Sequence, residues 1–178
     1  MKQVVSVVLL IVNDDLNKEL HYLSQKFSGI NLFGLNQNNL PHITLAQFPA
    51  SPEESNNLWD QVKNLKNAVH ELSVGGVNLS PSFNHRQTWI ELQILNSVAL
   101  RELHQSVINI EFSKSHELIN ASNDQFRPHI TLGLVDSLKF DINFNFDPRY
   151  LVFKTPIKVR LAVGINGEYF TFNKIIED

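Results

Sequence analysis

The sequence contains no cysteine, which excludes disulfide bonds, cysteine-ligated zinc, iron–sulfur clusters and thiol catalysis. An excess of either charge is also missing, because fifteen Lys and Arg against eighteen Asp and Glu give a formal net charge of −3. We therefore expect no polybasic surface of the kind that binds a long nucleic-acid duplex. Any nucleic-acid ligand should be short or gripped locally.

The chain also has no apolar window of transmembrane length. The opening run from Val4 to Val12 is interrupted only by Ser6 and is too short to span a bilayer. It ends in Asn13-Asp14-Asp15 rather than in small residues that suit a signal peptidase, so we interpret it as a buried central strand. We expect a cytoplasmic protein with no membrane partner.

What the composition does contain is typical of a folded domain. Hydrophobic residues make up 43% of the 178 residues and charged residues 19%, with no low-complexity tract. Disorder, collagen and coiled coil are thereby excluded as descriptions of the whole chain. The length fits one domain, residues 1–178, with room for two lobes, and we expect it to be a monomer.

Periodicity and turn signals predict an α+β fold with mostly antiparallel strands. Helices are predicted over 16–27 after a cap at Asn13 or Asp14, from Pro52 onward after a capping box at 51–54, and over 100–110. Strands are predicted at 4–12, 40–48, 72–79 with a bulge or tight bend at Gly75-Gly76, 88–94 and 126–135. Alternation over 150–172 with the turn signal Asn166-Gly167 predicts a final hairpin. Residues 113–124 are polar enough to be a loop.

One pentapeptide occurs twice. Residues 41–45 and residues 128–132 both read Pro-His-Ile-Thr-Leu, 87 positions apart. Chance alone produces such a repeat in roughly one chain in 200 of this size, so coincidence is a poor explanation. The half-chain spacing predicts two related lobes, each of which supplies one copy.

The pentapeptide has the pattern of a strand start. Proline cannot donate to a ladder and belongs at the first position of a strand, so each histidine lies just inside one. Alternation places His42 and Thr44 on one face, and His129 and Thr131 on one face, while the isoleucine and leucine of each copy point into the core. The next residue on the polar face is alanine in the first copy and glycine in the second, which leaves room for a ligand.

Two histidine–threonine pairs that face each other form a complete acid/base couple. One imidazole can accept a proton while the other donates one, and the threonine hydroxyls can hold a phosphoryl group between them. Hydrolysis of a phosphodiester fits this arrangement and requires no metal. Two alternatives stay open: ordinary strand histidines bonded to nearby backbone, and a metal site, although neither motif has a carboxylate close in sequence.

These residues resemble the two-histidine (2H) phosphoesterase superfamily, which is defined by two His-x-Thr/Ser-x elements. The elements here are His42-Ile43-Thr44-Leu45 and His129-Ile130-Thr131-Leu132. Phe126-Arg127-Pro128 before the second element, and Gly167-Glu168-Tyr169 near the end, are similar to the bacterial branch of 2'-5' RNA ligases or RNA 2',3'-cyclic phosphodiesterases. The resemblance spans nearly the whole chain. One departure is Leu40, which stands where the second copy has Arg127.

The resemblance implies a bilobal fold with two mostly antiparallel sheets in a pseudo-twofold arrangement, helices on the outside and a central groove. It implies metal-independent hydrolysis of a 2',3'-cyclic or 2'-5' linked nucleotide or RNA-end phosphodiester, with no cofactor. His42 and His129 would be the acid/base pair, and Thr44 and Thr131 would hold the phosphate. The alternative is a non-catalytic protein that binds nucleotides or RNA ends in the same groove, and an RNA-end ligase ranks below both because water competes with a hydroxyl end.

Three further residues are candidates for substrate contacts. Arg127 shares a face with His129 if the strand already runs there, which suits a phosphate, although pairing with Asp124 or Asp136 is equally compatible. Trp89 lies on the polar face of its strand, and Phe48 is placed by alternation on the face of His42, so both rings are candidates for stacking a base. Burial in a core is the alternative for each ring. Lys158 and Arg160 share one side of a strand, which is typical of a solvated face.

Overall fold

A computed structural model of the chain describes residues 3–26, 31–35, 39–65, 71–82, 86–120, 123–136, 156–167 and 171–176. The elements in chain order are β1 (Gln3–Ile11), α1 (Asp14–Lys26), β2 (Asn31–Gly34), β3 (His42–Ala50), α2 (Pro52–Val62), β4 (Glu71–Leu72), β5 (Val74–Pro81), β6 (Gln87–Ile94), α3 (Val98–Ile108), α4 (Glu111–Ser115), β7 (His129–Asp136), β8 (Ile157–Asn166) and β9 (Phe172–Ile176), with 3-10 turns at Lys63–Leu65 and Asn123–Gln125. The predicted α+β class is confirmed.

Side chains cap the first turns of α1 and α2 at the positions that the sequence predicts. The Asn13 carboxamide oxygen accepts hydrogen bonds from the backbone of Asp15 and Leu16, which caps α1. At α2 the capping box is complete: the Ser51 hydroxyl accepts from the Glu54 N–H, and the Glu54 carboxylate accepts from the Ser51 N–H. These contacts satisfy N–H groups that have no partner within the helix.

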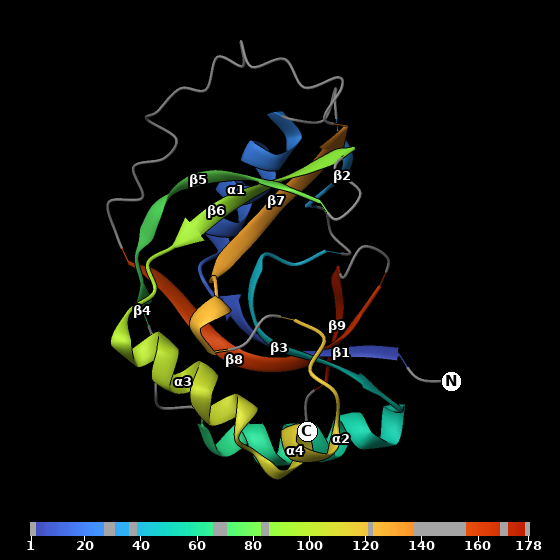
Figure 1. The fold of residues 1–178 in the computed structure, drawn as a ribbon. Coiled ribbons are helices and arrows are strands. Elements are labelled where there is room, and N and C mark those ends of the chain that lie inside the picture. Colours follow the sequence, from blue (N-terminus) through green and yellow to red (C-terminus); the bar gives the residue numbers. More distant parts are fainter. Residues whose placement is uncertain are drawn as a thin grey trace.

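All pairings between the described strands are antiparallel, and they form one continuous path in the order β4-β8-β1-β3-β7-β6-β5, with β9 beside β8 and β2 beside β7. Figure 1 shows β5, β6 and β7 with α1 behind them in the upper part, and β8, β1 and β3 above α2, α3 and α4 in the lower part. The two halves of the sheet join where β3 pairs with β7, at Ile43 and Ile130. The expected separation into two sheets is therefore not seen, since hydrogen bonding continues through this pair.

Each half contains the same strand–helix–strand unit. The first unit is β1-α1-β3, with β2 inserted before its second strand, and the second unit is β6-α3-β7, with α4 inserted at the same place. In each unit the second strand begins at the histidine of one copy of the repeat. The helices cross over: α1 packs against β7 of the other half, and α3 packs against β3. The strands that carry the two copies, β3 and β7, also share one burial pattern over their first seven residues. The histidine and the threonine are half-buried, and the other five residues are buried.

A β-bulge lies at the leucine of each copy. Along β1 the partners pass from Thr44 to Ala46, so Leu45 is the extra residue. Along β6 the partners pass from Thr131 to Gly133, so Leu132 is the extra residue. An extra residue interrupts the ladder and shifts the alternation of side chains beyond it.

A buried side chain from a helix donates a hydrogen bond to the backbone carbonyl of each bulged leucine. The Ser24 hydroxyl of α1 donates to the Leu132 carbonyl at 2.6 Å and accepts from the Leu35 N–H at 2.7 Å. In the other half, Nδ1 of His104 on α3 donates to the Leu45 carbonyl at 2.9 Å. Each bulge is thereby satisfied by the helix that crosses from the opposite half, which ties the two halves together.

Other sequence expectations have mixed outcomes. The bulge at Gly75-Gly76 is confirmed by the register shift between β5 and β6 and by the positive φ of Gly76, and the β8–β9 hairpin is confirmed as antiparallel. The interpretation of residues 113–124 as loop is wrong at its start, where α4 continues to Ser115. The strand β2 was not predicted. The expected helix stop at residues 28–29, and residues 168–169 of the family-like tripeptide, lie outside the described residues.

Among the described residues, no helix is both long enough and apolar enough to cross a membrane.

The bulge at Leu132 yields a test of the cross-over contact. Ser24→Ala removes one hydroxyl and leaves both the Leu132 carbonyl and the Leu35 N–H without this partner in a buried place. We expect the free energy of unfolding, measured by urea denaturation, to fall by about 1–3 kcal/mol. The control is Ser106→Ala, whose exposed hydroxyl bonds only to a carbonyl of its own helix, and which should change stability by less than about 0.5 kcal/mol. Equal effects in both variants would contradict this role for Ser24.

Candidate active site

The strands β3 and β7, which carry the two copies of the repeat, pair side by side, and the polar side chains of both copies lie on one face of the sheet. Ile43 and Ile130 are opposite each other in the ladder, and both are fully buried in the main hydrophobic core. Their neighbours in each strand point the other way, so the histidine and threonine of both copies project from the same face. His42 and His129 are diagonal neighbours across this antiparallel pair, and such neighbours are about 7–8 Å apart. At this spacing one phosphoryl group can lie between the two imidazole rings.

Both imidazoles are oriented in the same way. Nδ1 of His42 donates to the Leu40 carbonyl at 2.7 Å, and Nδ1 of His129 donates to the Arg127 carbonyl at 2.8 Å. A carbonyl oxygen can only accept, so Nδ1 carries the hydrogen in each ring. In the neutral ring Nε2 is then the basic nitrogen, and it is the atom left for proton transfer.

His42 lies against an apolar cluster. Its ring is 5.3 Å from that of Phe172, which is fully buried with Val8, Leu10 and neighbouring aliphatic side chains. Removal of water disfavours the charged imidazolium and lowers the pKa of His42 from 6.5 to about 4, and the nearby charge of His129 acts in the same direction.

Phe172 takes this position because β8 has a glycine beneath it. A Cβ at Gly164 would lie 2.2 Å from the Phe172 ring. A larger residue at Gly164 would therefore collide with that ring and with the backbone carbonyl of Lys174 on β9. The ring in turn lies against His42.

His129 has a charged environment. Glu91 on β6, which is 3% exposed, places Oε1 3.5 Å from Nε2 of His129. Both carboxylate oxygens of Glu91 also accept hydrogen bonds from the guanidinium of Arg127. On β5, Asn78 donates to the same carboxylate, and Ser80 accepts from Arg127 at 3.4 Å.

The two histidines thus occupy equivalent backbone positions with different neighbours. In the ladders, Val8 is opposite Thr44 as Glu91 is opposite Thr131. Leu40 precedes His42 by two residues as Arg127 precedes His129, and Leu40 packs on the cluster that contains Val8. An apolar pair beside one histidine is therefore replaced by an ion pair beside the other.

The three substrate-contact candidates have different outcomes. Trp89 is half-buried and lies on the face of Glu91, two residues along β6, so it remains a candidate for stacking. The placement of Phe48 on the face of His42 is wrong: the bulge at Leu45 turns Phe48 into the core, where it is fully buried and packs edge-on against Phe112 at 5.5 Å. Arg127 is half-exposed and pairs with Glu91 rather than with Asp124 or Asp136.

The same bulges move the small residues that the alternation placed beside the histidines. Ala46 is opposite Val7 and belongs to the main core, and Gly133 is opposite the buried Ile90. They therefore do not provide room for a ligand on the polar face.

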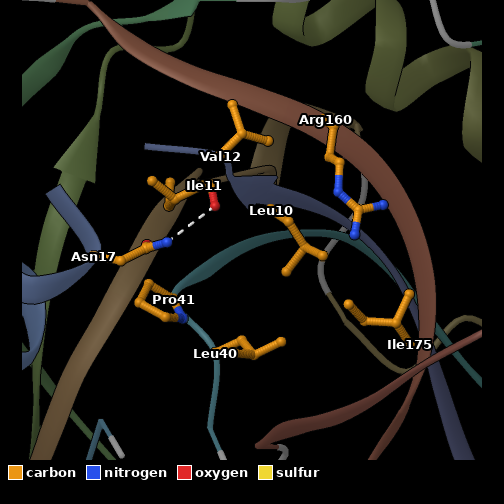
Figure 2. A pocket seen from close by; sticks show the side chains of 8 residues that line it. All are labelled: Leu10, Ile11, Val12, Asn17, Leu40, Pro41, Arg160 and Ile175. Carbon is orange, nitrogen blue, oxygen red and sulfur yellow. Dashed lines mark hydrogen bonds between the residues drawn. The ribbon is translucent and has the colours of Figure 1, made fainter. Parts of the chain in front are cut away.

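A pocket of about 280 Å³ adjoins the start of β3. Figure 2 shows it lined by Leu10, Ile11, Val12, Asn17, Leu40, Pro41, Arg160 and Ile175. Leu10 is opposite His42 in the ladder, and the two residues before His42 form part of the wall. The pocket is mostly apolar, with the Arg160 side chain extending toward it from β8.

No group of three or more His, Asp or Glu side chains suited to a metal ion occurs among the residues that the structure describes.

The environment of His42 yields a test by titration. We expect its ring to remain neutral with the hydrogen on Nδ1 at pH 6, and to take up a proton near pH 4, as followed by nitrogen-15 NMR of the imidazole. An unfolded histidine binds its proton near pH 6.5, so the stabilising contribution is complete above pH 6.5 and is lost as the pH falls toward 4.

The corresponding stability measurement compares the chain with His42→Asn. The free energy of unfolding of the variant should decline less between pH 6.5 and pH 4. His104, whose pKa is lowered by burial, and Glu54, whose pKa is lowered by its hydrogen bond from Ser51, contribute to the decline in both proteins. A His42 ring that titrates near pH 6.5 would contradict the environment described above.

Comparison with known proteins supports the fold. No family model matches the chain, and no curated protein matches it. Among solved structures, apo LigT of E. coli has a TM-score of 0.62 at 14% identity, covering 99% of this chain and 95% of LigT, and its complex with 3'-AMP gives the same values. A crystal structure described as a phosphoesterase has a TM-score of 0.52 at 12% identity and covers 99% of this chain and 97% of that one. The chain therefore has the LigT-like fold that the resemblance to the 2H phosphoesterases predicts.

Proposed function

We propose that the chain is a phosphodiesterase that hydrolyses a small nucleotide or RNA-end phosphodiester through His42 and His129, with no need for a metal ion. The observation that carries this proposal is the pair of equivalent imidazoles. Both leave Nε2 for proton transfer, and both project from one face beside a threonine. The whole length, residues 1–178, would act as one domain made of two related lobes.

In the proposed reaction the two rings exchange one proton each with the reactants. His42 is neutral at pH 7 because its pKa is lowered to about 4, so Nε2 accepts a proton from water as the water oxygen attacks phosphorus. The bond between phosphorus and one ribose oxygen breaks, and His129 donates the proton that this oxygen takes up. Thr44 and Thr131 donate hydrogen bonds to the non-bridging phosphoryl oxygens. Proton exchange with solvent restores both rings.

The substrate class is supported by size and charge. LigT has been crystallised with phosphate, ATP, 3'-AMP and NADP+, all of which are phosphate compounds of modest size. A net charge of −3 does not favour a long polyanion. The apolar pocket beside His42, with Arg160 at its edge, is suited to the nucleoside part of such a substrate, and Trp89 offers a second stacking surface on the side of His129.

Substitution of either histidine tests the acid/base pair. His42→Asn and His129→Asn should each lower kcat for a 2',3'-cyclic nucleotide by about 10²–10⁴-fold with little change in unfolding, and His116→Asn serves as the control outside the site. The product and the broken bond are identified by phosphorus NMR. The acidic limb of the pH dependence of kcat/KM should be centred near pH 4, because protonation of His42 removes the base.

The same assay separates the alternatives. Activity should persist in EDTA, and loss of activity that zinc restores would replace this mechanism with a metal hydrolase. Tight binding of a cyclic nucleotide with no turnover over hours would instead establish a non-catalytic nucleotide-binding protein.

A further inference from the structure

Glu91 is a buried carboxylate in the candidate site for which the acid/base mechanism has no role. Its side chain is 3% exposed, and it is held by Arg127 and Asn78 while it lies 3.5 Å from Nε2 of His129. Carboxylates are seldom buried without a partner. Here the supporting amide comes from β5 and the partner guanidinium from just before β7, so Glu91 is held in one place from two sides.

Glu91 lies close to the place where a phosphoryl group must bind. It is opposite Thr131 in the β6–β7 ladder and on the same face. A phosphoryl oxygen that is hydrogen-bonded to Nε2 of His129 lies about 3 Å from that nitrogen, and hence within about 6.5 Å of the Glu91 carboxylate. Such a separation is shorter than the Debye length, so salt does not remove the interaction.

The fold does not require a charge at this position. In the other half, Val8 and Leu40 take the places of Glu91 and Arg127 and support the same strand pairing with an apolar contact. A buried ion pair is often no more stabilising than an apolar pair of similar size. The ion pair is therefore better explained by its effect on a ligand than by its effect on stability.

We propose that Glu91, held in place by Arg127, is a specificity-determining residue that favours singly charged phosphodiesters over doubly charged phosphomonoesters. This inference rests on the proposed function, because it assigns the phosphate to the face of His129. Cleavage of a diester creates a monoester with one more negative charge at neutral pH. The carboxylate repels that added charge, so the same residue discriminates against monoester ligands and promotes release of the product.

The size of the effect follows from Coulomb's law. One additional charge about 6 Å from the carboxylate changes the affinity by about tenfold when the effective dielectric constant is about 40, between the values for a protein surface and for water. Removal of the charge should therefore strengthen monoester binding about tenfold more than diester binding.

The test compares dissociation constants of 3'-AMP and 2',3'-cyclic AMP by calorimetry at pH 8, where the monoester is doubly charged. All proteins carry His42→Asn so that the diester is not consumed. In this background Glu91→Gln should change the ratio of the two constants about tenfold in favour of 3'-AMP, and Glu91→Asp should retain most of the original preference. Glu102→Gln, an exposed change on α3 that alters the net charge equally, is the matched control.

An unchanged ratio in Glu91→Gln, or an equal change in Glu102→Gln, would overturn the inference. Glu91→Met, neutral and of similar length, replaces Glu91→Gln if the latter does not fold. Failure of the proposed function is a separate result: the chain with His42 intact would not hydrolyse the cyclic diester, while the binding ratio could still be measured. If neither nucleotide binds, both proposals are wrong.

Discussion

The contact between Ile43 and Ile130 is the constraint on which the candidate site depends. Both side chains are fully buried in the core, and this pair is where β3 and β7 join the two halves of the sheet. Since neighbouring residues in a strand point to opposite faces, burial of the isoleucines turns the adjacent histidines and threonines to the other side. The cross-over hydrogen bonds from α1 and α3 to the two bulges then hold the halves in this register.

The two histidines have equivalent backbone positions but different electrostatic environments. Desolvation beside Phe172 lowers the pKa of His42, whereas His129 is beside the ion pair of Glu91 and Arg127. Acid/base catalysis by two rings of one type needs such a difference, because one ring must begin without the proton that the other supplies. In this chain the difference comes from neighbouring side chains, while the orientation of each ring through Nδ1 is the same.

Much of this arrangement follows from local sequence signals, and the remainder does not. The repeat predicts the strands and the shared face of each histidine and threonine, because these need only proline at a strand start and period-two alternation. Alternation fails beyond Leu45, since a bulge depends on the neighbouring strand, and Phe48 is buried as a result. Glu91 carries no motif at all: its position matters only because β6 pairs with β7 and Arg127 reaches it. The sequence itself shows only a lone acidic residue on a strand whose alternate positions are apolar.

The equivalent positions of Val8 and Glu91 bear on how such a site can diversify. Two separate copies of one unit, related by an exact rotation axis, must present identical residues on both sides, and a change on one side is always made on the other as well. Joining both units in one polypeptide removes that obligation. Each flank can then acquire its own substitutions, which is how an apolar neighbour on one side coexists with a carboxylate on the other.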